Sequence, residues 1–597
     1  MTTPRARAVL LPAACAFALA FAAAPAAPAR RDAPPARGAS PAPAIEEHLL
    51  ANGMKLVLVP RHLSPTVAGA WVARVGSANE RPGITGISHL FEHMMFKGTH
   101  VIGTRDYEKD VRLIEQQEAL QDSIRAELSA LRAAQRRGEL DDMTKPESKT
   151  PRMRELEKRF DGLVAEQRAN MVKNEFNTVL QRNGATGINA FTNNDMTVYF
   201  ETVPANRLEL WFWMEADRLR NRVFREFYSE RDVVYEERRL RTESTPTGKF
   251  AESFDAVFWD ASPYAWPVVG WPSDVASITR AQADEYYALY YQPQNLTAVL
   301  VGDFDPKAAL ALAERYLGAI PPGARPAPEM ITMESRSLAE KRFHGEAETN
   351  PAATVRWHTV AFTHRDAPVL EIVDGLLTGP AGRLRRSLVL KQGVATSARA
   401  AHEPLKYEGS FEITAEAKEG RTPEEVEQAI YGEVERLKSE PVGADELQAA
   451  KNRYLTAAYR QLNSNFLIGL RYAVSEGRGD LHGAERIEAA VQGVTSEDVQ
   501  RVAQAYFTKE GRAVAIWTRK GGGAEDPELA ALPPPARERA RAGLARIRAA
   551  SDPEKLQQML DMFDQMGAQM PPEAKPAIEY LRGKAQARLR ELSTPKP

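Results

Sequence analysis

The segment at positions 89–93 places two imidazoles and a carboxylate within five residues, in the pattern H-x-x-E-H. His89 and His93 are four residues apart, so on a helix they lie on one face and can share one metal ion. Glu92 flanks that face, where a carboxylate can take a proton from metal-bound water, whose pKa a zinc ion lowers to about 7. The apolar residues at 94–96 provide a wall that excludes bulk water. The segment therefore predicts a hydrolytic zinc site rather than two core histidines beside a solvated glutamate.

Composition limits the ligands and the partners of this site. The single cysteine, Cys15, lies in the N-terminal segment, so histidine, aspartate and glutamate are the available zinc ligands. Lysine and arginine number 78 against 80 aspartates and glutamates, which gives no reason to expect a nucleic-acid partner. At 597 residues the chain is long enough for two or more domains.

Residues 1–29 have the character of a signal peptide. Arg5 and Arg7 precede an alanine-rich apolar stretch, which is followed by small residues suited to cleavage. A retained membrane anchor is the alternative, but the stretch is short for a span and contains Pro12. We expect export to the periplasm or the extracellular space, with no stable membrane span. Residues 30–44, rich in proline and alanine, are predicted to be a flexible linker.

The elements around the zinc motif are predicted from hydrophobic patterning. Residues 54–60 and 67–75 are short β-branched runs, and we expect them to be neighbouring strands. Glycines at 83 and 86 interrupt the chain, and residues 87–96 have helical character.

Residues 107–176 differ in kind from the rest. Mostly apolar residues, with Gln117 and Gln167 among them, recur at intervals of three and four from 113 to 131 and again from 153 to 171, on either side of a polar stretch at 138–151. This pattern predicts an antiparallel helical hairpin packed like a coiled coil. We favour a spacer with its own apolar seam over a partner-docking arm.

A weak internal repeat indicates two related halves. Thr279 to Tyr290 leads into the β-rich run at 297–302, and Thr495 to Tyr506 leads into a similar run at 513–517. Both halves should be α+β domains, separated by the proline-rich stretch at 321–328. A tail at 521–597 is proline-rich and then helical and charged.

The H-x-x-E-H motif and its surroundings resemble the insulinase/pitrilysin family of inverted-zincin metallopeptidases, in particular bacterial members similar to the mitochondrial processing peptidase. The resemblance covers about residues 45 to 520. It is carried by the segments at 86–99, 189–192, 197–200, 230–237 and 263–270. It implies two insulinase-type halves in tandem, a zinc-binding catalytic domain at 45–320 that contains the hairpin, and a non-catalytic domain at 329–520.

The resemblance also implies a third zinc ligand on a downstream helix, seven residues after another acid. Those positions hold Glu237 and Glu230. Glu237 lies 144 residues after His93, and removing about 69 residues of hairpin restores the family spacing of roughly 75. Glu236 is the competing ligand but points about 100° away on a helix. Glu230, nearly two turns before Glu237, would orient one of the metal-binding histidines without itself binding the metal.

Two further segments bear on substrate. Asn189, Ala190 and Phe191 resemble the edge strand to which the family's peptide substrates add as another strand. The second half departs from the family, which carries an arginine and a tyrosine here near the zinc. Their positions hold Val389 and Thr396.

The expected function is that of a zinc metalloendopeptidase with one Zn²⁺ per chain. It would hydrolyse peptide bonds in unfolded peptides or small polypeptides, by Glu92-assisted attack of zinc-bound water. The alternative is a non-proteolytic zinc-binding scaffold or assembly subunit of the same fold. The missing arginine and tyrosine lead us to expect a same-fold partner subunit, or a homodimer using other donors. We interpret His358 and His364, in strand-like surroundings, as structural.

Overall fold

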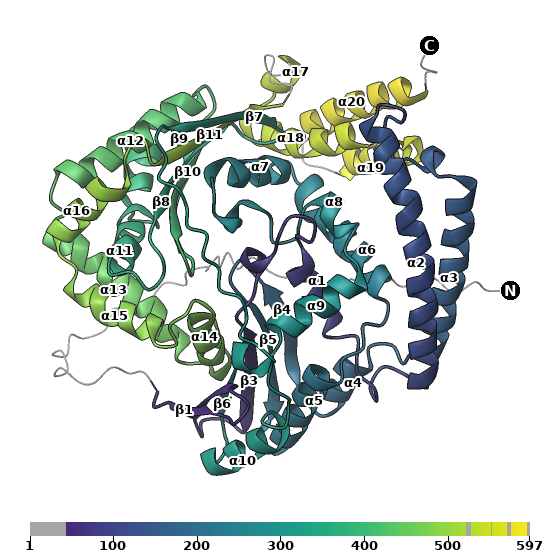
Figure 1. Cartoon of the computed structure of the whole chain (residues 1–597). Helices are drawn as coiled ribbons and strands as arrows, with labels where there is room; N and C mark the ends of the chain where they lie inside the picture. Colours follow the sequence, from purple (N-terminus) through teal and green to yellow (C-terminus); the bar gives the residue numbers. More distant parts are fainter. Residues whose placement is uncertain (1–42, 521–526, 551, 570–574, 594–597) are drawn as a thin grey trace.

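The computed structural model describes residues 43–520, 527–550, 552–569 and 575–593. The predicted signal peptide and nearly all of the predicted linker lie outside these residues. Two β-sheets, each covered by helices, form the body of the molecule (Figure 1). They fall on either side of residues 321–340, which contain no helix or strand.

The first sheet is mixed and has the strand order β1-β2-β6-β3-β5-β4. Its strands are β1 (Glu46–Leu49), β2 (Lys55–Pro60), β3 (Thr66–Ala73), β4 (Thr186–Thr192), β5 (Thr197–Pro204) and β6 (Leu296–Gly302). The expectation that β2 and β3 are neighbours is wrong. Strand β6, more than 200 residues later in the chain, lies between them, parallel to β2 and antiparallel to β3.

The second sheet repeats this scheme, with the order β7-β11-β8-β10-β9. Its strands are β7 (Lys341–Ala347), β8 (Ala352–Thr359), β9 (Ala395–Pro404), β10 (Gly409–Ala417) and β11 (Arg512–Arg519). The last strand again inserts, parallel to β7 and antiparallel to β8. In both halves a helix with a threonine capping box precedes the inserted strand. Thr279 caps α9 (Arg280–Tyr290) and Thr495 caps α16 (Ser496–Tyr506). The predicted α+β fold with two related halves is therefore confirmed.

Helices cover the outer face of each sheet and enclose the main cores. The remaining helices of the first half, apart from residues 107–170, are α1 (Ile87–Met94), α4 (Glu175–Arg182), α5 (Leu208–Arg220), α6 (Phe227–Arg238), α7 (Gly248–Phe258), α8 (Pro272–Val275) and α10 (Pro306–Tyr316). Those of the second half are α11 (Ala367–Leu377), α12 (Pro423–Ser439), α13 (Ala444–Gln461), α14 (Asn465–Gly477) and α15 (Gly483–Gly493).

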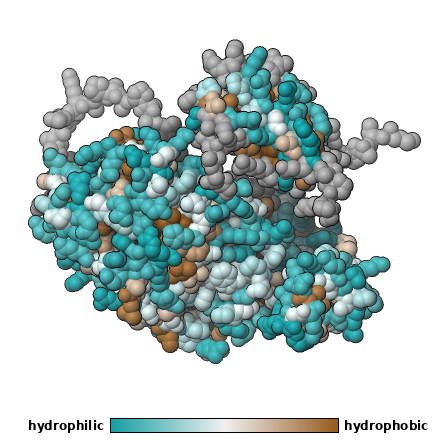
Figure 2. Space-filling model, turned by 90° about the horizontal axis from the view of Figure 1, so that it is seen from above, coloured by the Kyte–Doolittle hydropathy of each residue, from teal (hydrophilic) through white to brown (hydrophobic). Residues whose placement is uncertain are grey.

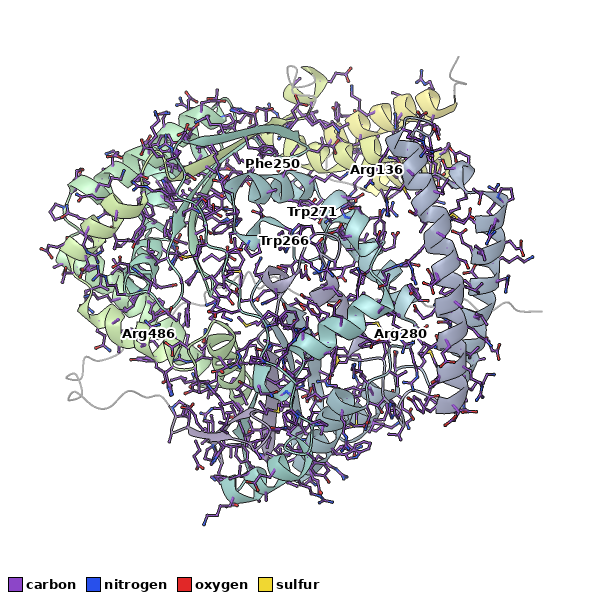
Figure 3. The ribbon with its side chains drawn as sticks, in the orientation of Figure 1. Arg136, Phe250, Trp266, Trp271, Arg280 and Arg486 are labelled. Atoms are coloured by element: carbon purple, nitrogen blue, oxygen red, sulfur yellow. The ribbon has the colours of Figure 1, made fainter. Side chains whose placement is uncertain are left out.

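The two halves exchange one helix each. Helix α14 of the second half packs on β3, β5 and β6 of the first sheet, where Ile468 and Tyr472 join alternate strand residues in a separate core. Helix α7 of the first half packs on β7 and β11 of the second sheet. Phe250 of α7 lies beneath these strands, with its ring 4.8 Å from Phe343 and 5.2 Å from Trp517 (Figure 3). Each sheet is therefore completed by the other half.

A buried carboxylate fastens α14 to β2, to β6 and to the residue that follows β3 in the first sheet. Glu476, with a side chain 4% exposed, lies 3.0 Å from Lys55 Nζ and 3.0 Å from Arg74 NH1. Thr297 Oγ1 donates a hydrogen bond of 3.1 Å to the same carboxylate. Because both carboxylate oxygens are satisfied by donors of the other half, the contact combines charge with geometric specificity.

Residues 107–170 form the predicted antiparallel helical hairpin, with helices α2 (Tyr107–Arg136) and α3 (Pro151–Asn170) (Figure 1). The second helix ends at Asn170, six residues earlier than expected, and Phe176 belongs to the next helix, α4. The predicted seam residues do pack together, around Leu120, Ile124 and Leu156. Towards the base of the hairpin the seam becomes polar, where Gln117 donates to Gln167.

The C-terminal segment folds into helices α17 (Pro527–Ala530), α18 (Pro534–Ala549), α19 (Pro553–Gln569) and α20 (Lys575–Ser593), which share a small core. The last three occupy the upper right of the molecule in Figure 1. Seen from above, the surface is mostly hydrophilic, with apolar side chains in small separate groups (Figure 2). Among the described residues, no helix combines the length and apolar character required to cross a membrane.

Replacing Glu476 by Gln should destabilise the protein, because Lys55 and Arg74 lose their shared counter-charge at a largely buried contact. We expect a loss of about 1–3 kcal/mol, seen as a fall of several degrees in the midpoint of thermal unfolding followed by circular dichroism. The control is Glu435→Gln, which removes an exposed ion pair with Lys438. That change should cost less than about 0.5 kcal/mol. Equal midpoints for the two variants would contradict the interpretation of Glu476 as a clamp.

Candidate metal centre

Helix α1, which carries the H-x-x-E-H motif, is short and depends on its surroundings for its position. Gly86 precedes it with φ of 92°, a left-handed conformation that favours glycine. The buried carboxylate of Glu80 accepts hydrogen bonds of 2.8 Å from the backbone N–H groups of Gly86 and Ser88. It thus satisfies two donors at the start of the helix. Burial raises the pKa of Glu80 to about 8.

Helix α6, which carries Glu230 and Glu237, is held at its first turn by the hairpin. Tyr228 donates a hydrogen bond of 2.7 Å to Glu118 of α2. Glu226, just before the helix, has φ of 54° and lies 2.9 Å from Arg168 Nε of α3. A left-handed conformation is strained for glutamate and persists only where its surroundings hold it. Both helices of the hairpin therefore contact the start of α6 and hold it in place.

The structure brings three predicted ligands together. His89, His93 and Glu237 offer one ligand atom each, all within 4.8 Å of one another. Glu237 Oε2 lies 3.3 Å from His93 Nε2 and 3.7 Å from His89 Nε2. Ligands bound at 2.0–2.2 Å around a tetrahedral ion lie roughly 3.3–3.5 Å apart. The donor set and its spacing therefore fit a zinc ion with one position left open.

The other acids of α6 occupy different surroundings. Glu236 points outward and pairs with Arg239, with both side chains more than half exposed. Glu230 Oε2 lies 3.5 Å from His93 Nδ1, on the side of the ring opposite the ligand nitrogen. Its other oxygen accepts from Lys97. Glu230 can therefore orient His93, and Glu236 is too remote to act as a ligand.

The charges at this cluster are strongly coupled. Burial lowers the pKa of His89 to about 3, so this ring is neutral and its lone pair is available. Burial also acts to lower the pKa of His93, but the carboxylates of Glu230 and Glu237 outweigh it and raise the pKa to about 9. Burial opposes ionisation of Glu237 as well, yet the two histidines and Arg241 lower its pKa to about 2. A metal ion bound here would displace a proton from His93.

Glu92 lies on the other side of the cluster, against strand β4. Thr192 Oγ1 donates a hydrogen bond of 2.8 Å to Glu92 Oε2. Burial raises the pKa of Glu92, although the Thr192 hydrogen bond partly opposes the shift. The side chain is therefore poised to hold a proton.

Strand β4 is an edge strand, because it pairs with β5 and lies at the end of the first sheet. Asn189 is exposed, Ala190 is buried and Phe191 is half-buried, so the strand alternates as an edge strand should. Beside it lies a cavity of about 310 Å³. Its lining includes His93 and Glu92 of the cluster and Phe96, Lys97, Phe176 and Glu226.

Val389 and Thr396, which stand where the family carries arginine and tyrosine, have ordinary structural roles in the second half. Val389 is partly buried against the second core, and the hydroxyl of Thr396 lies 3.3 Å from the carboxylate of Glu416. His358 stacks on Phe258, with ring centroids 3.9 Å apart, as a structural histidine does.

Sequence reasoning assigned no role to Thr192, Lys97 or Arg241, all of which contact the site. The first two lie within segments that carry the family resemblance. Arg241 follows Glu237 by four residues, a spacing at which helical side chains of opposite charge pair.

Comparisons with known proteins agree with this architecture. The family model described as insulinase (peptidase family M16) matches residues 56–119. The model described as peptidase M16 inactive domain matches residues 277–454, which run from the last elements of the first half into the second half. The zinc protease PqqE of Helicobacter pylori is 24% identical over 472 residues, covering 78% of this chain and 90% of the relative. The uncharacterized zinc protease YmxG of Bacillus subtilis is 21% identical, covering 78% and 96%.

Solved structures show the same fold. A protease from Helicobacter pylori has a TM-score of 0.65 at 22% identity, covering 80% of this chain and 99% of the other. The periplasmic protease PqqL from Escherichia coli has a TM-score of 0.57 at 17% identity, covering 79% and 47%. The duplicated fold is thus peptidase-like. Together these matches support the insulinase/pitrilysin family, peptidase family M16, for this chain.

Two adjacent acids test the ligand assignment. Glu237→Gln should weaken zinc binding by about 100-fold or more, because a neutral amide is a poorer ligand than a carboxylate. Glu236→Gln is the matched control and should leave zinc affinity unchanged. Competition with a chromophoric chelator measures both. If Glu236→Gln proves the more damaging, the register of ligands on α6 is misassigned.

Proposed function

We propose that this protein is a zinc-dependent metalloendopeptidase that cleaves unfolded peptides. The observation that carries the proposal is the convergence of His89, His93 and Glu237 beside Glu92, next to an exposed edge strand. A metal-binding set alone would suit a structural site. The added buried carboxylate and strand edge suit hydrolysis of an extended chain.

His89 Nε2, His93 Nε2 and Glu237 Oε2 would hold the zinc ion. When bound, zinc supplies Lewis acidity that polarises a carbonyl and lowers the pKa of water. Glu92 accepts the proton of the attacking water and returns it to the departing amine. Thr192 occupies Oε2 of Glu92 and so directs the other oxygen towards that task. Glu230 holds the ring of His93 by its Nδ1 side.

Strand β4 supports a peptide as substrate. An extended segment can pair with the open edge at Asn189, Ala190 and Phe191 through backbone hydrogen bonds, which tolerate many sequences. The cavity of about 310 Å³ beside this edge can receive one side chain and give a preference. Folded proteins offer no free extended segment, so unfolded peptides and small polypeptides are the expected substrates.

The place of action follows from the N-terminal sequence and from a relative. The signal-peptide character of residues 1–29 supports export. The similar protein PqqL is called a periplasmic protease. We infer that this protein also acts in the periplasm or outside the cell.

A scaffold role is the alternative. The description "inactive domain" belongs to the model that matches residues 277–454, which exclude the H-x-x-E-H motif. A scaffold has no need of the buried Glu92 and its Thr192 hydrogen bond. These features favour the peptidase.

Replacing Glu92 by Gln should abolish most turnover and leave zinc in place, because Glu92 is not one of the clustered ligands. General-base effects are worth about 10²–10⁴-fold in rate. Metal content and cleavage of an unstructured peptide should be measured with and without chelator, using Glu236→Gln as the surface control. Loss of zinc from Glu92→Gln, or full activity, would show that its role is misassigned.

Val389 and Thr396 lead us to propose a partner subunit. The developing oxyanion needs donors, and losing one costs about 10²–10³-fold in rate. Neither valine nor threonine at these positions can replace a guanidinium and a phenol. A same-fold chain that carries both groups in its second half could supply them to this site.

The isolated chain should therefore bind one zinc ion but cleave peptides poorly. Adding a same-fold chain with arginine and tyrosine at the equivalent positions should raise kcat/KM by about 10²-fold or more. Light scattering of the purified chain distinguishes a monomer from a homodimer that uses other donors. Full peptidase activity from a monomer would sink the partner proposal.

A further inference from the structure

Arg241 lies against the metal cluster, in a position that no part of the proposed mechanism uses. It belongs to the π-helical turn η4 (Arg239–Glu243), which continues directly from α6. Its guanidinium forms an ion pair with Glu237 Oε1, across four residues. Wide turns of this kind re-aim side chains and are frequent at functional sites.

The turn is held in place on both sides. Arg238, just before it, forms a bidentate ion pair with Glu252 of α7, at 2.6 and 2.8 Å. Thr245 Oγ1 donates a hydrogen bond of 2.9 Å to the backbone carbonyl of Arg241. Gly248 approaches so closely that a Cβ atom there would lie 2.2 Å from the carbonyl oxygen of Thr242. The backbone that carries Arg241 therefore has one well-defined course.

The ion pair divides the carboxylate of Glu237 into two different oxygens. Oε1 faces Arg241. Oε2 faces the histidines, 3.3 Å from His93 Nε2 and 3.7 Å from His89 Nε2. A guanidinium on one oxygen of a carboxylate repels a cation there and so favours the other oxygen as the metal ligand.

This division matters for hydrolysis. A catalytic zinc site needs three protein ligands and one open position for water or substrate. If Glu237 bound through both oxygens, it would take up that position or crowd it. If the side chain rotated freely, the two modes would interchange.

We propose that Arg241 is a positioning residue that restricts Glu237 to one ligand oxygen and so keeps the fourth metal position open. The inference rests on the proposed zinc-dependent function and adds a residue to it. Arg241 acts through Glu237 and does not itself touch the metal.

A surface ion pair of this kind contributes little to folding. Arg241 is 42% exposed, and solvent screens exposed ion pairs four residues apart on a helix so strongly that they add little to stability. Variants at this position should therefore fold normally. The effect belongs to the site and not to stability.

The same turn provides a matched control. Arg239 pairs with Glu236, also an arginine–glutamate pair, but both side chains point to solvent. Replacing either arginine by methionine removes one charge from the same turn and keeps an unbranched, flexible stem at that position. Only Arg241→Met removes the partner of Glu237.

The experiment uses the full chain loaded with Co²⁺ in place of zinc. Visible absorption of Co²⁺ weakens when a four-coordinate site becomes five-coordinate, so the spectrum reports ligand number without any turnover. Wild type and Arg239→Met should give the strong spectrum of a four-coordinate site, with one ion per chain. Arg241→Met should bind one ion with a distinctly weaker spectrum, and Arg241→Lys should recover part of the intensity because it restores a cation.

Turnover of the zinc-loaded variants gives a second readout. In Arg241→Met, kcat should fall by about 10–100-fold, the usual effect of losing a group that orients a ligand, with KM little changed. An unchanged Co²⁺ spectrum in Arg241→Met overturns the inference, even if activity falls. In that case the zinc function stands, because the wild-type site still binds metal. Failure of the wild-type chain to bind Co²⁺ or zinc overturns both.

Discussion

The buried ion pair of Arg225 and Asp110 is the contact on which the arrangement of the metal cluster depends. Both side chains are fully buried, and Arg225 Nε lies 2.6 Å from Asp110 Oδ2. The guanidinium also donates to the backbone carbonyls of Lys97, Thr99 and Ile102. A charge so enclosed is tolerable only when paired and hydrogen-bonded, and removing one partner of such a pair typically costs about 3–5 kcal/mol. One side chain thus joins the loop after α1, the base of the hairpin and the start of α6.

Because of this junction, the hairpin helps to fix the position of α6. The two helices of the hairpin reach α6 through Glu118, Tyr228 and Arg168, and Gln167 accepts a hydrogen bond from the backbone of Glu226. The cluster combines histidines from α1 with a carboxylate from α6, so its geometry requires that these helices keep a fixed relation. The hairpin lies within the 144 residues that separate His93 from Glu237. Packing on the chain itself compensates for that length.

Local patterns revealed the zinc motif and the hairpin, because both follow from periodicity within a short window. Glu237 rather than Glu236 was implied by the family resemblance, and the 100° between the two around one helix favoured the same choice. The neighbours of β2 could not be chosen, because β6 inserts from a distant part of the chain. The exchange of α7 and α14 could not be predicted either. Both helices have apolar faces, but their sequences do not indicate which sheet each one covers. Arg241 could not be singled out, because a glutamate followed by an arginine four residues later is also the pattern of an ordinary surface ion pair on a helix.

The exchange of helices has a consequence for biosynthesis. The first sheet is complete in strands once residue 302 has left the ribosome, but the face that α14 covers stays open until residues 465–477 follow. Some 160 residues of elongation separate the two events, and apolar surface exposed for that time invites aggregation. The N-terminal half therefore lacks one side of a core until α14 has been synthesised. Holding the chain unfolded until α14 has emerged, as chaperones and export machinery do, suits a protein built in this way.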